Sequence, residues 1–242
     1  TGKEKYVPGG AANVAVNIAA IGIETELCAV IGNDDNGEKL LELLQERGVS
    51  VNAVVKDSSR STTMKLRYIG LNNQQIFRVD IEDTVPLSLF IIQDILVKIS
   101  ENVSQYGLFV LSDYNKGYLT GEITQFFINL GRQNNIPVLV DVKDKNYEKY
   151  KNADLLKPNR NELAKLTDLP VFTKEEVIKA SVNLCSKASC TYVLATLGAD
   201  GMILVDKAGA IQEVKSTASE VYDVTGAGDT SLAYLAAKLF EG

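Results

Sequence analysis

The sequence has 242 residues, of which 45 % are hydrophobic and 23 % are charged, a composition typical of one large α/β domain or two small domains and not of a disordered or fibrous chain. No apolar run approaches the roughly 20 residues that cross a bilayer, so a membrane partner is not expected. The 25 lysine and arginine residues against 31 aspartate and glutamate residues give a net charge of −6, which makes nucleic acid an unfavourable partner.

The first half of the chain alternates between helical and strand periods. The apolar stripe of Val14, Ile18 and Ile21 predicts a buried helix over residues 11–21. Further along we expect a strand at 27–31, a helix between Asn33 and Gly48, strands at 62–69 and 74–81, and a helix at 86–100 with Pro86 in its first turn. The two adjacent strands predict a polar-faced hairpin, inserted as a lid at about residues 61–81.

The second half predicts alternating β and α elements, which is typical of a parallel sheet covered on both faces. We expect strands at 108–111, 138–140, 192–195, 202–205 and 211–214. We expect helices at 120–134, just after residue 159 and at 174–186, and residues 224–240 are expected to form a glycine-rich turn that leads into a last helix. No linker or repeat interrupts the pattern, so one main domain over residues 1–242 with the hairpin insertion is the expected organisation.

Two residue types restrict the chemistry and the location. The chain contains no histidine, which excludes Ser-His-Asp and Cys-His catalytic groups and histidine-ligated metals, so acid–base chemistry must use Asp, Glu, Lys or Tyr. Its three cysteines have no Cys-x-x-Cys spacing, which favours a reducing compartment and a cytoplasmic location.

The most informative segment is Asp-Val-Thr-Gly-Ala-Gly-Asp-Thr at residues 223–230. Gly226 and Gly228 allow the backbone to approach a ligand, and the first amides of the following helix can point together at an anion. Asp229 lies just inside this cradle and can accept a proton from a nearby hydroxyl. The competing interpretation is an ordinary capped helix start. The segment is neither a Walker A loop nor a dinucleotide-binding fingerprint.

Four motifs, in this order, resemble those of the ribokinase-like (phosphofructokinase-B-type) carbohydrate kinases: Gly9-Gly10-Ala11-Ala12-Asn13, Lys157-Pro158-Asn159-x-x-Glu162, Thr196-Leu197-Gly198-x-x-Gly201 and the segment at 223–229. Within that family, the segments at 63–67, 75–80, 111–117 and 220–223 resemble the D-glycero-β-D-manno-heptose 7-phosphate kinases. The resemblance implies a three-layer α/β sandwich with a mostly parallel sheet and a small β lid.

The implied reaction is the ATP-dependent phosphorylation of heptose 7-phosphate at its anomeric hydroxyl, which gives the 1,7-bisphosphate for ADP-heptose and lipopolysaccharide core synthesis. Two alternatives remain: a ribokinase-like kinase for another sugar or nucleoside, and a catalytically silent protein that binds sugar or nucleotide. The resemblance further implies a homodimer, because the lid sheets of this family often pair between subunits.

The resemblance assigns Asp229 as the catalytic base, with an anion hole formed by the amides of Gly226, Ala227 and Gly228. Asn159 matches the family's Asn-x-x-Glu motif, which organises Mg²⁺ and phosphate.

Glu162 completes that motif and is expected to act on the metal through water. The same spacing fits a helix N-cap with a capping box. The nucleotide-side loop is matched by Thr196, Gly198 and Gly201, which alone would predict only a β-turn.

The sugar is expected to contact the start of the first helix at Gly9, Gly10 and Asn13, which match the family's motif. A distal phosphate needs cationic donors in a chain of negative charge. The candidates are Lys65, Arg67 and Arg78 on the hairpin, and Lys116 beyond a strand end. The alternative is that these are solvated charges on exposed strands.

Two aspartates each follow an apolar strand, where ligands collect in open α/β sheets. Asp113 is expected at the sugar, and Asp141 with Lys143 at the nucleotide. The subfamily's usual Asp-Pro-Lys is Asp-Val-Lys here. The family's opening strand before Gly9 and its helices after Gly242 are not in this sequence, so we expect an incomplete chain.

Overall fold

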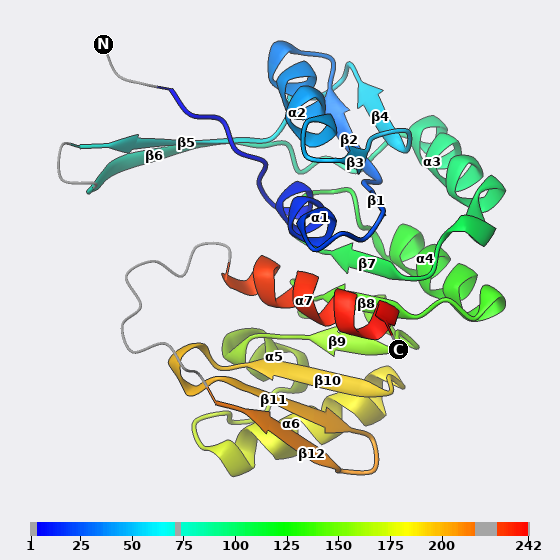
Figure 1. Cartoon of the computed structure of the whole chain (residues 1–242). Coiled ribbons are helices and arrows are strands. Elements are labelled where there is room, and N and C mark those ends of the chain that lie inside the picture. Colours follow the sequence, from blue (N-terminus) through cyan, green and yellow to red (C-terminus); the bar gives the residue numbers. More distant parts are fainter. Residues whose placement is uncertain (1–3, 71–73, 216–226, 242) are drawn as a thin grey trace. The chain divides into compact units, whose positions relative to one another are not determined.

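The computed structural model describes residues 4–70, 74–215 and 227–241 (Figure 1). The chain divides into two compact units. Unit 1 comprises Thr1–Ile99 and Lys116–Tyr118, and unit 2 comprises Ser100–Asn115 and Leu119–Gly242. Among the described residues, no helix combines the length and the apolarity that a membrane crossing requires.

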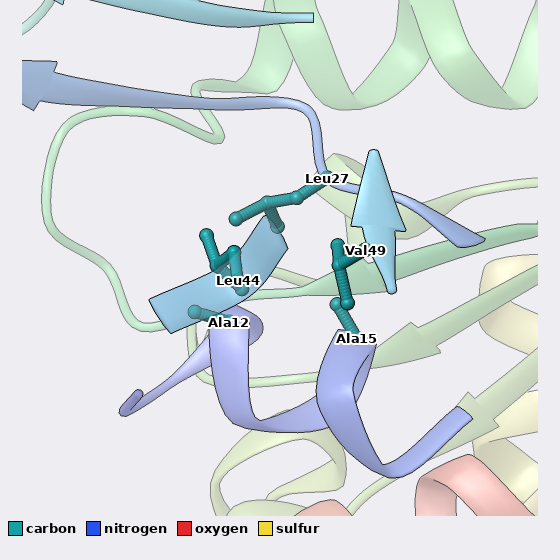
Figure 2. Packing of buried hydrophobic residues seen from close by; sticks show 5 residues of the cluster. All are labelled: Ala12, Ala15, Leu27, Leu44 and Val49. Carbon is teal, nitrogen blue, oxygen red and sulfur yellow. The ribbon is translucent and has the colours of Figure 1, made fainter. Parts of the chain in front are cut away.

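Unit 1 is built from short parallel strand pairs and helices. Its helices are α1 (Ala11–Ala20), α2 (Asp35–Gln45) and most of α3 (Leu89–Glu101). Strand β1 (Thr25–Glu26) pairs with β3 (Val49–Ser50), and β2 (Ala29–Gly32) pairs with β4 (Val54–Asp57). Figure 2 shows the core that joins α1 and α2 to this layer, made of Ala12, Ala15, Leu27, Leu44 and Val49.

The predicted hairpin is present in unit 1 as β5 (Met64–Ile69) and β6 (Gln75–Ile81), which form a separate two-stranded antiparallel sheet. Strand alternation gives this hairpin two different faces. One face carries charged side chains, and the other carries apolar ones, including the rings of Tyr68 and Phe77, which stack with centroids 4.1 Å apart.

Unit 2 is organised around a six-stranded sheet in the order β12-β11-β10-β9-β8-β7. The strands are β7 (Phe109–Ser112), β8 (Val138–Asp141), β9 (Leu155–Lys157), β10 (Tyr192–Thr196), β11 (Met202–Asp206) and β12 (Ile211–Val214). Strands β7 to β10 are parallel, and β11 runs antiparallel to both of its neighbours, β10 and β12. The expected mostly parallel sheet is therefore confirmed.

Four α-helices belong to this sheet: α4 (Gly121–Asn134), α5 (Arg160–Thr167), α6 (Lys174–Ala188) and α7 (Ala227–Glu241). Figure 1 shows α6 behind the sheet and α7 in front of it. The apolar stripe of α7 is buried at Leu232, Ala233, Ala236 and Ala237. Short 3₁₀ turns occur at Val103–Gln105, Tyr147–Tyr150 and Gly198–Asp200.

Three predicted elements differ from the structure. Helix α3 begins at Leu89, not Pro86, because the Ser88 hydroxyl accepts a hydrogen bond from the amide of Ile91 and so caps the helix three residues later. The strand predicted at 27–31 is present as β2 and begins only at Ala29, since Leu27 lies between β1 and β2 and packs into the core. The turn predicted at 198–201 is a 3₁₀ turn.

Candidate functional site

Polar side chains collect at one edge of the sheet in unit 2. Asp141, Lys157 and Thr196 are the last residues of β8, β9 and β10, and Tyr114 lies two residues beyond β7. Because these four strands are parallel, their carboxyl ends meet at the same edge. This is the position at which open α/β sheets bind ligands.

The start of α7 brings a carboxylate to these strand ends. Asp229 lies in the first turn of α7, where the backbone amides have no partner within the helix and the helix dipole favours negative charge. Its Oδ1 accepts a hydrogen bond of 3.0 Å from the hydroxyl of Tyr114. Burial, followed by the neighbouring Asp229 carboxylate, raises the pKa of Tyr114 well above its ordinary value, so the phenol remains a donor.

A buried ion pair connects the ends of β8 and β9. Lys157 Nζ lies 2.9 Å from Asp141 Oδ1, and the two side chains are 4 % and 20 % exposed. Burial raises the pKa of Asp141, the charge of Lys157 opposes that rise, and the carboxylates of Glu162 and Asp229 add to it. Lys157 Nζ also lies 3.8 Å from the position that a Cβ on Gly228 would take. One ammonium group is thus close to the start of α7.

The Asn-x-x-Glu segment forms the start of α5 as a complete capping box. Asn159 Oδ1 accepts from the amide of Glu162 at 2.9 Å, and Glu162 Oε2 accepts from the amide of Asn159 at 2.8 Å. The other oxygen of Glu162 accepts from Lys143 Nζ at 2.9 Å. This bond is the main cause of a raised Lys143 pKa. The capping interpretation is confirmed, and a further role toward a nucleotide remains a prediction.

These contacts limit how the segment could hold a metal. Both oxygens of Glu162 already accept a hydrogen bond, and the described residues contain no group of three His, Cys, Asp or Glu side chains that could hold an ion. Mg²⁺ keeps several of its waters in proteins and needs few direct carboxylate ligands. The residues present therefore fit Mg²⁺ only through water.

The loop after β10 lies beside this capping box. Thr196 forms a β-bridge with Asn159 and donates its amide to the carbonyl of Pro158 at 2.9 Å. The loop then turns through Gly198 at φ 64° and Gly201 at φ 88°, left-handed conformations that side chains disfavour. The structure therefore brings Thr196, Gly198 and Gly201 to the same edge as Asn159.

Asp113 is the most completely bonded carboxylate of this edge. Its Oδ1 accepts from the amide of Asn115 at 2.7 Å, and its Oδ2 accepts from the Tyr150 hydroxyl and from Lys149 Nζ, both at 2.6 Å. All but 1 % of its side chain is buried. The Tyr150 hydroxyl in turn accepts from the amides of Lys143 and Asp144. Asp113 therefore joins the loops that follow β7 and β8.

The predicted sugar residues of the first helix lie in unit 1. Gly10 is the N-cap of α1 and has a positive φ of 56°, which a residue with a side chain would adopt only under strain. Gly9 precedes it and is exposed, and Asn13 is half-buried in the first turn. A Cβ on Gly9 would meet no described atom within 4 Å.

The hairpin of unit 1 gathers the predicted cations on one face. Arg67 lies directly opposite Arg78, and Lys65 lies opposite Asp80. Arg78 Nε contacts Asp80 Oδ1 at 2.9 Å, and the three cations are exposed. Lys116, also in unit 1, pairs with Glu82 just beyond β6 and so lies at the base of the hairpin. The structure brings these four cations to one hairpin.

Two residues of the site were not among the predicted site residues. They are Lys157, which lies close to Gly228, and Tyr114, which donates a hydrogen bond to Asp229. Lys157 comes directly after the apolar residues Leu155 and Leu156. The same pattern, a polar residue after an apolar strand, selected Asp113 and Asp141, so it could also have identified Lys157. Gly226 lies outside the described residues, and Ala227 is described only as the first residue of α7.

The sequence and the fold are similar to those of known carbohydrate kinases. A family model described as pfkB family carbohydrate kinase matches residues 2–242. Among curated proteins, the chain is 40 % identical over 240 residues to "Bifunctional protein HldE" of Sulfurimonas denitrificans and 37 % identical over 240 residues to the protein of that name in Pelobacter propionicus. The alignments cover 99 % of this chain but 50 % and 49 % of those proteins. The chain thus spans about half the length of the curated relatives it matches.

Solved structures of sugar kinases have a similar fold. Phosphofructokinase-2 from Escherichia coli in complex with fructose-6-phosphate has a TM-score of 0.80 at 25 % identity, over 96 % of this chain and 75 % of that one. Arabidopsis thaliana ribokinase complexed with ribose and ATP has a TM-score of 0.77 at 24 % identity, over 97 % of this chain and 75 % of that one. The ribokinase-like α/β fold expected from the sequence is therefore confirmed.

The buried pair at the sheet edge gives a test of stability. We expect Lys157→Met to lower the free energy of unfolding by about 3 kcal/mol, because it leaves the carboxylate of Asp141 buried without its cation. The loss should be smaller at acidic pH, where the unpaired carboxyl can take up a proton. Urea denaturation at pH 5 and pH 8 measures both effects.

The matched control is Lys143→Met, which removes an ammonium that is 52 % exposed and pairs with Glu162. Because water reaches and screens this ammonium, the loss should stay within about 1 kcal/mol. Similar losses for the two variants would contradict a special role of the buried pair.

Proposed function

The chain belongs to the pfkB family of carbohydrate kinases, and on that premise we propose that it transfers the γ-phosphoryl group of ATP to the anomeric hydroxyl of D-glycero-β-D-manno-heptose 7-phosphate. The product is the 1,7-bisphosphate, a precursor of ADP-heptose for the lipopolysaccharide core. The resemblance of four segments to heptose 7-phosphate kinases and the similarity to the bifunctional HldE proteins support this substrate.

The observation that carries the proposal is that one carboxylate and one ammonium group both lie near the start of α7. The carboxylate of Asp229 lies in the first turn, and the ammonium of Lys157 lies near Gly228. A phosphoryl transfer to an alcohol needs a group that takes the proton and positive charge that balances the moving phosphoryl group. Both requirements are met within one turn of this helix.

In the proposed reaction, the sugar's anomeric oxygen attacks the γ-phosphorus of ATP as the bond from that phosphorus to the β–γ bridging oxygen breaks. Asp229 takes the proton of the hydroxyl, and ADP leaves with the bridging oxygen. The amides of Ala227 and Gly228 in the first turn of α7, together with that of Gly226, which lies outside the described residues, form the proposed anion hole. The ammonium of Lys157, paired with Asp141, lies close to Gly228. Alignment and charge balance supply most of the catalysis in such transfers.

The nucleotide is proposed to bind along the edge formed by β8, β9 and β10. The residues assigned to it are Asn159, Glu162, Thr196, Gly198, Gly201, Asp141 and Lys143. Their shared location supports the assignment, since the capping box of α5 contacts both the loop after β10 and Lys143. When bound, Mg²⁺ would neutralise phosphate charge, and Glu162 would hold it through water.

The sugar phosphate is proposed to bind residues of unit 1, with Gly9, Gly10 and Asn13 at the hydroxyls. The distal phosphate is assigned to the charged face of the hairpin, which carries Lys65, Arg67 and Arg78 against a single aspartate. Two arginines opposite one another suit a dianion, because each guanidinium presents several donors in a fixed plane. Lys116 at the base of the hairpin is the fourth proposed cation.

Asp113 has a different proposed role from the one expected of it. Its carboxylate already accepts from three protein donors and is buried. A sugar hydroxyl would have to compete with those donors for the same oxygens. We therefore assign Asp113 to holding the loops of the site in place.

The other face of the hairpin is proposed to bind a second copy of the chain. Tyr68, Phe77, Val79 and Ile81 lie on this face and are 40 % to 50 % exposed. An isolated two-stranded sheet is only marginally stable in water, so a covered apolar face would stabilise it. If this face packs against the same face of another copy, the apolar side chains of both copies are removed from water. The proposed location is the cytoplasm, where ATP is available and the three free thiols would persist.

The assignment of the base is tested by Asp229→Asn. We expect kcat to fall at least about 100-fold while the affinity for ATP stays nearly unchanged, because the amide keeps the shape of the side chain but cannot take a proton. Steady-state kinetics with ATP and heptose 7-phosphate measure the first, and titration calorimetry measures the second. Full activity in this variant would remove Asp229 from the mechanism.

The assignment of the phosphate site is tested by Arg67→Ala. We expect KM for heptose 7-phosphate to rise at least about tenfold and KM for ATP to change less than about twofold, because the lost donors bind only the distal phosphate. Arg47→Ala, which removes an arginine at the end of α2 in the same unit, is the control and should change neither constant. Saturation of the wild-type enzyme by the non-phosphorylated heptose with equal kcat/KM would instead favour a kinase for another sugar.

The proposed dimer is tested by Phe77→Glu. We expect the wild-type protein to sediment as a dimer at micromolar concentration and this variant to sediment as a monomer, because a carboxylate would be buried against an apolar face. Val97→Glu is the control, since Val97 is 53 % exposed on α3, against 50 % for Phe77. A monomeric wild-type protein, or a dimeric Phe77→Glu variant, would refute pairing through the hairpin.

A further inference from the structure

We propose that Tyr114 is a positioning residue for the catalytic base, with its hydroxyl holding the carboxylate of Asp229 in the orientation that receives the sugar's proton. This inference rests on the proposed kinase function and assigns a role to a residue that the motif comparison left without one. The contact that carries it is the 3.0 Å hydrogen bond from the Tyr114 hydroxyl to Asp229 Oδ1.

The bond joins two segments that are 115 positions apart in the chain. A carboxylate on a first-turn residue can rotate about its Cβ–Cγ bond, and a donor fixed to one oxygen limits that rotation. Proton transfer depends on such alignment, because the base must reach the hydroxyl within hydrogen-bond distance. A phenol attached to a rigid loop is suited to this task.

The loop that carries Tyr114 is fixed on both sides. On one side, the amide of Asp113 donates to the carbonyl of Asp141 at 3.1 Å, which extends the pairing of β7 with β8. On the other side, the amide of Asn115 donates to Asp113 Oδ1 at 2.7 Å, and Asn115 adopts a left-handed φ of 54°. The backbone of Tyr114 is therefore held between two bonded neighbours.

The anchor of this loop is the buried carboxylate of Asp113. Lys149 and Tyr150, which bind its Oδ2, are 7 % and 0 % exposed, so solvent does not compete for these bonds. A buried carboxylate bonded to a cation and to a phenol is costly to displace. The backbone of Tyr114 is thus fixed at the carboxyl ends of the strands, and its hydroxyl bonds the carboxylate of Asp229.

The phenol keeps its proton under the conditions in which a kinase works. Burial is the largest cause of its raised pKa, and the charge of Asp229 is the next. Tyr114 therefore donates to the carboxylate and does not compete with it for the substrate's proton. A donated hydrogen bond also stabilises the charged form of the carboxylate, which is the form that acts as a base.

The experiment compares Tyr114→Phe with the wild-type, full-length protein, using ATP and heptose 7-phosphate. Phenylalanine keeps the ring and removes only the hydroxyl. We expect kcat to fall roughly tenfold with KM for ATP unchanged. The acid limb of the pH–rate profile should move to higher pH, because a base that has lost a hydrogen-bond donor is less favoured in its charged form.

Tyr192→Phe is the matched control. Tyr192 is 39 % exposed, against 36 % for Tyr114, and lies on β10 of the same unit. Removing the hydroxyl of Tyr192 should leave kcat and the pH–rate profile as in the wild type. The stability of both variants is followed by thermal unfolding, since a role in folding alone would lower the melting temperature without moving the acid limb.

Asp229→Asn separates the failure of this inference from the failure of the proposed function. If Asp229→Asn remains fully active, the proposed function loses its base and the inference falls with it. If Asp229→Asn is inactive while Tyr114→Phe keeps the wild-type kcat and pH profile, only the role of Tyr114 is refuted. If Tyr114 acts through Asp229, adding Tyr114→Phe to Asp229→Asn should lower kcat no further, and a further tenfold loss would refute that route.

Discussion

The ion pair between Asp141 and Lys157 is the interaction on which the candidate site depends. Both groups are largely removed from water, and a buried charge is tolerated only where a partner and further contacts compensate for the lost hydration. The pair therefore fixes the ends of β8 and β9 relative to one another. It also holds the ammonium of Lys157 close to Gly228, at the end of α7 whose dipole favours anions.

A second buried carboxylate extends the same principle to β7. Asp113 is bonded to Lys149, Tyr150 and the backbone of its own loop. The bonds of Asp113 hold the loop that carries Tyr114, and the carboxylate of Asp141 holds the ammonium of Lys157. Both side chains that lie near the start of α7 are therefore held by buried carboxylates. An apolar sheet thereby ends in a rigid polar edge. Such rigidity suits a transfer in which alignment supplies most of the rate.

The hairpin of unit 1 shows how strand alternation can separate two tasks. Successive side chains point to opposite faces, so one short sequence carries arginines on one face and aromatic rings on the other. The charged face suits an anion, and the apolar face suits a protein surface. The hairpin forms a two-stranded sheet of its own, separate from the six-stranded sheet of unit 2.

The sequence by itself determined the helices, the hairpin and five of the six strands of the large sheet, but not β9 or the short strands β1, β3 and β4. It also determined the capping box of α5 and the location of Asp229 in the first turn of α7, because periodicity, capping and glycine placement act between neighbours in the chain. Only the tertiary structure decided which charges meet: Lys157 with Asp141, Lys149 with Asp113, and Tyr114 with Asp229. These pairings depend on the order of strands in the sheet and on where α7 begins relative to β7. Spacing along the chain does not encode such distances, since the bonded residues come from segments up to 115 positions apart.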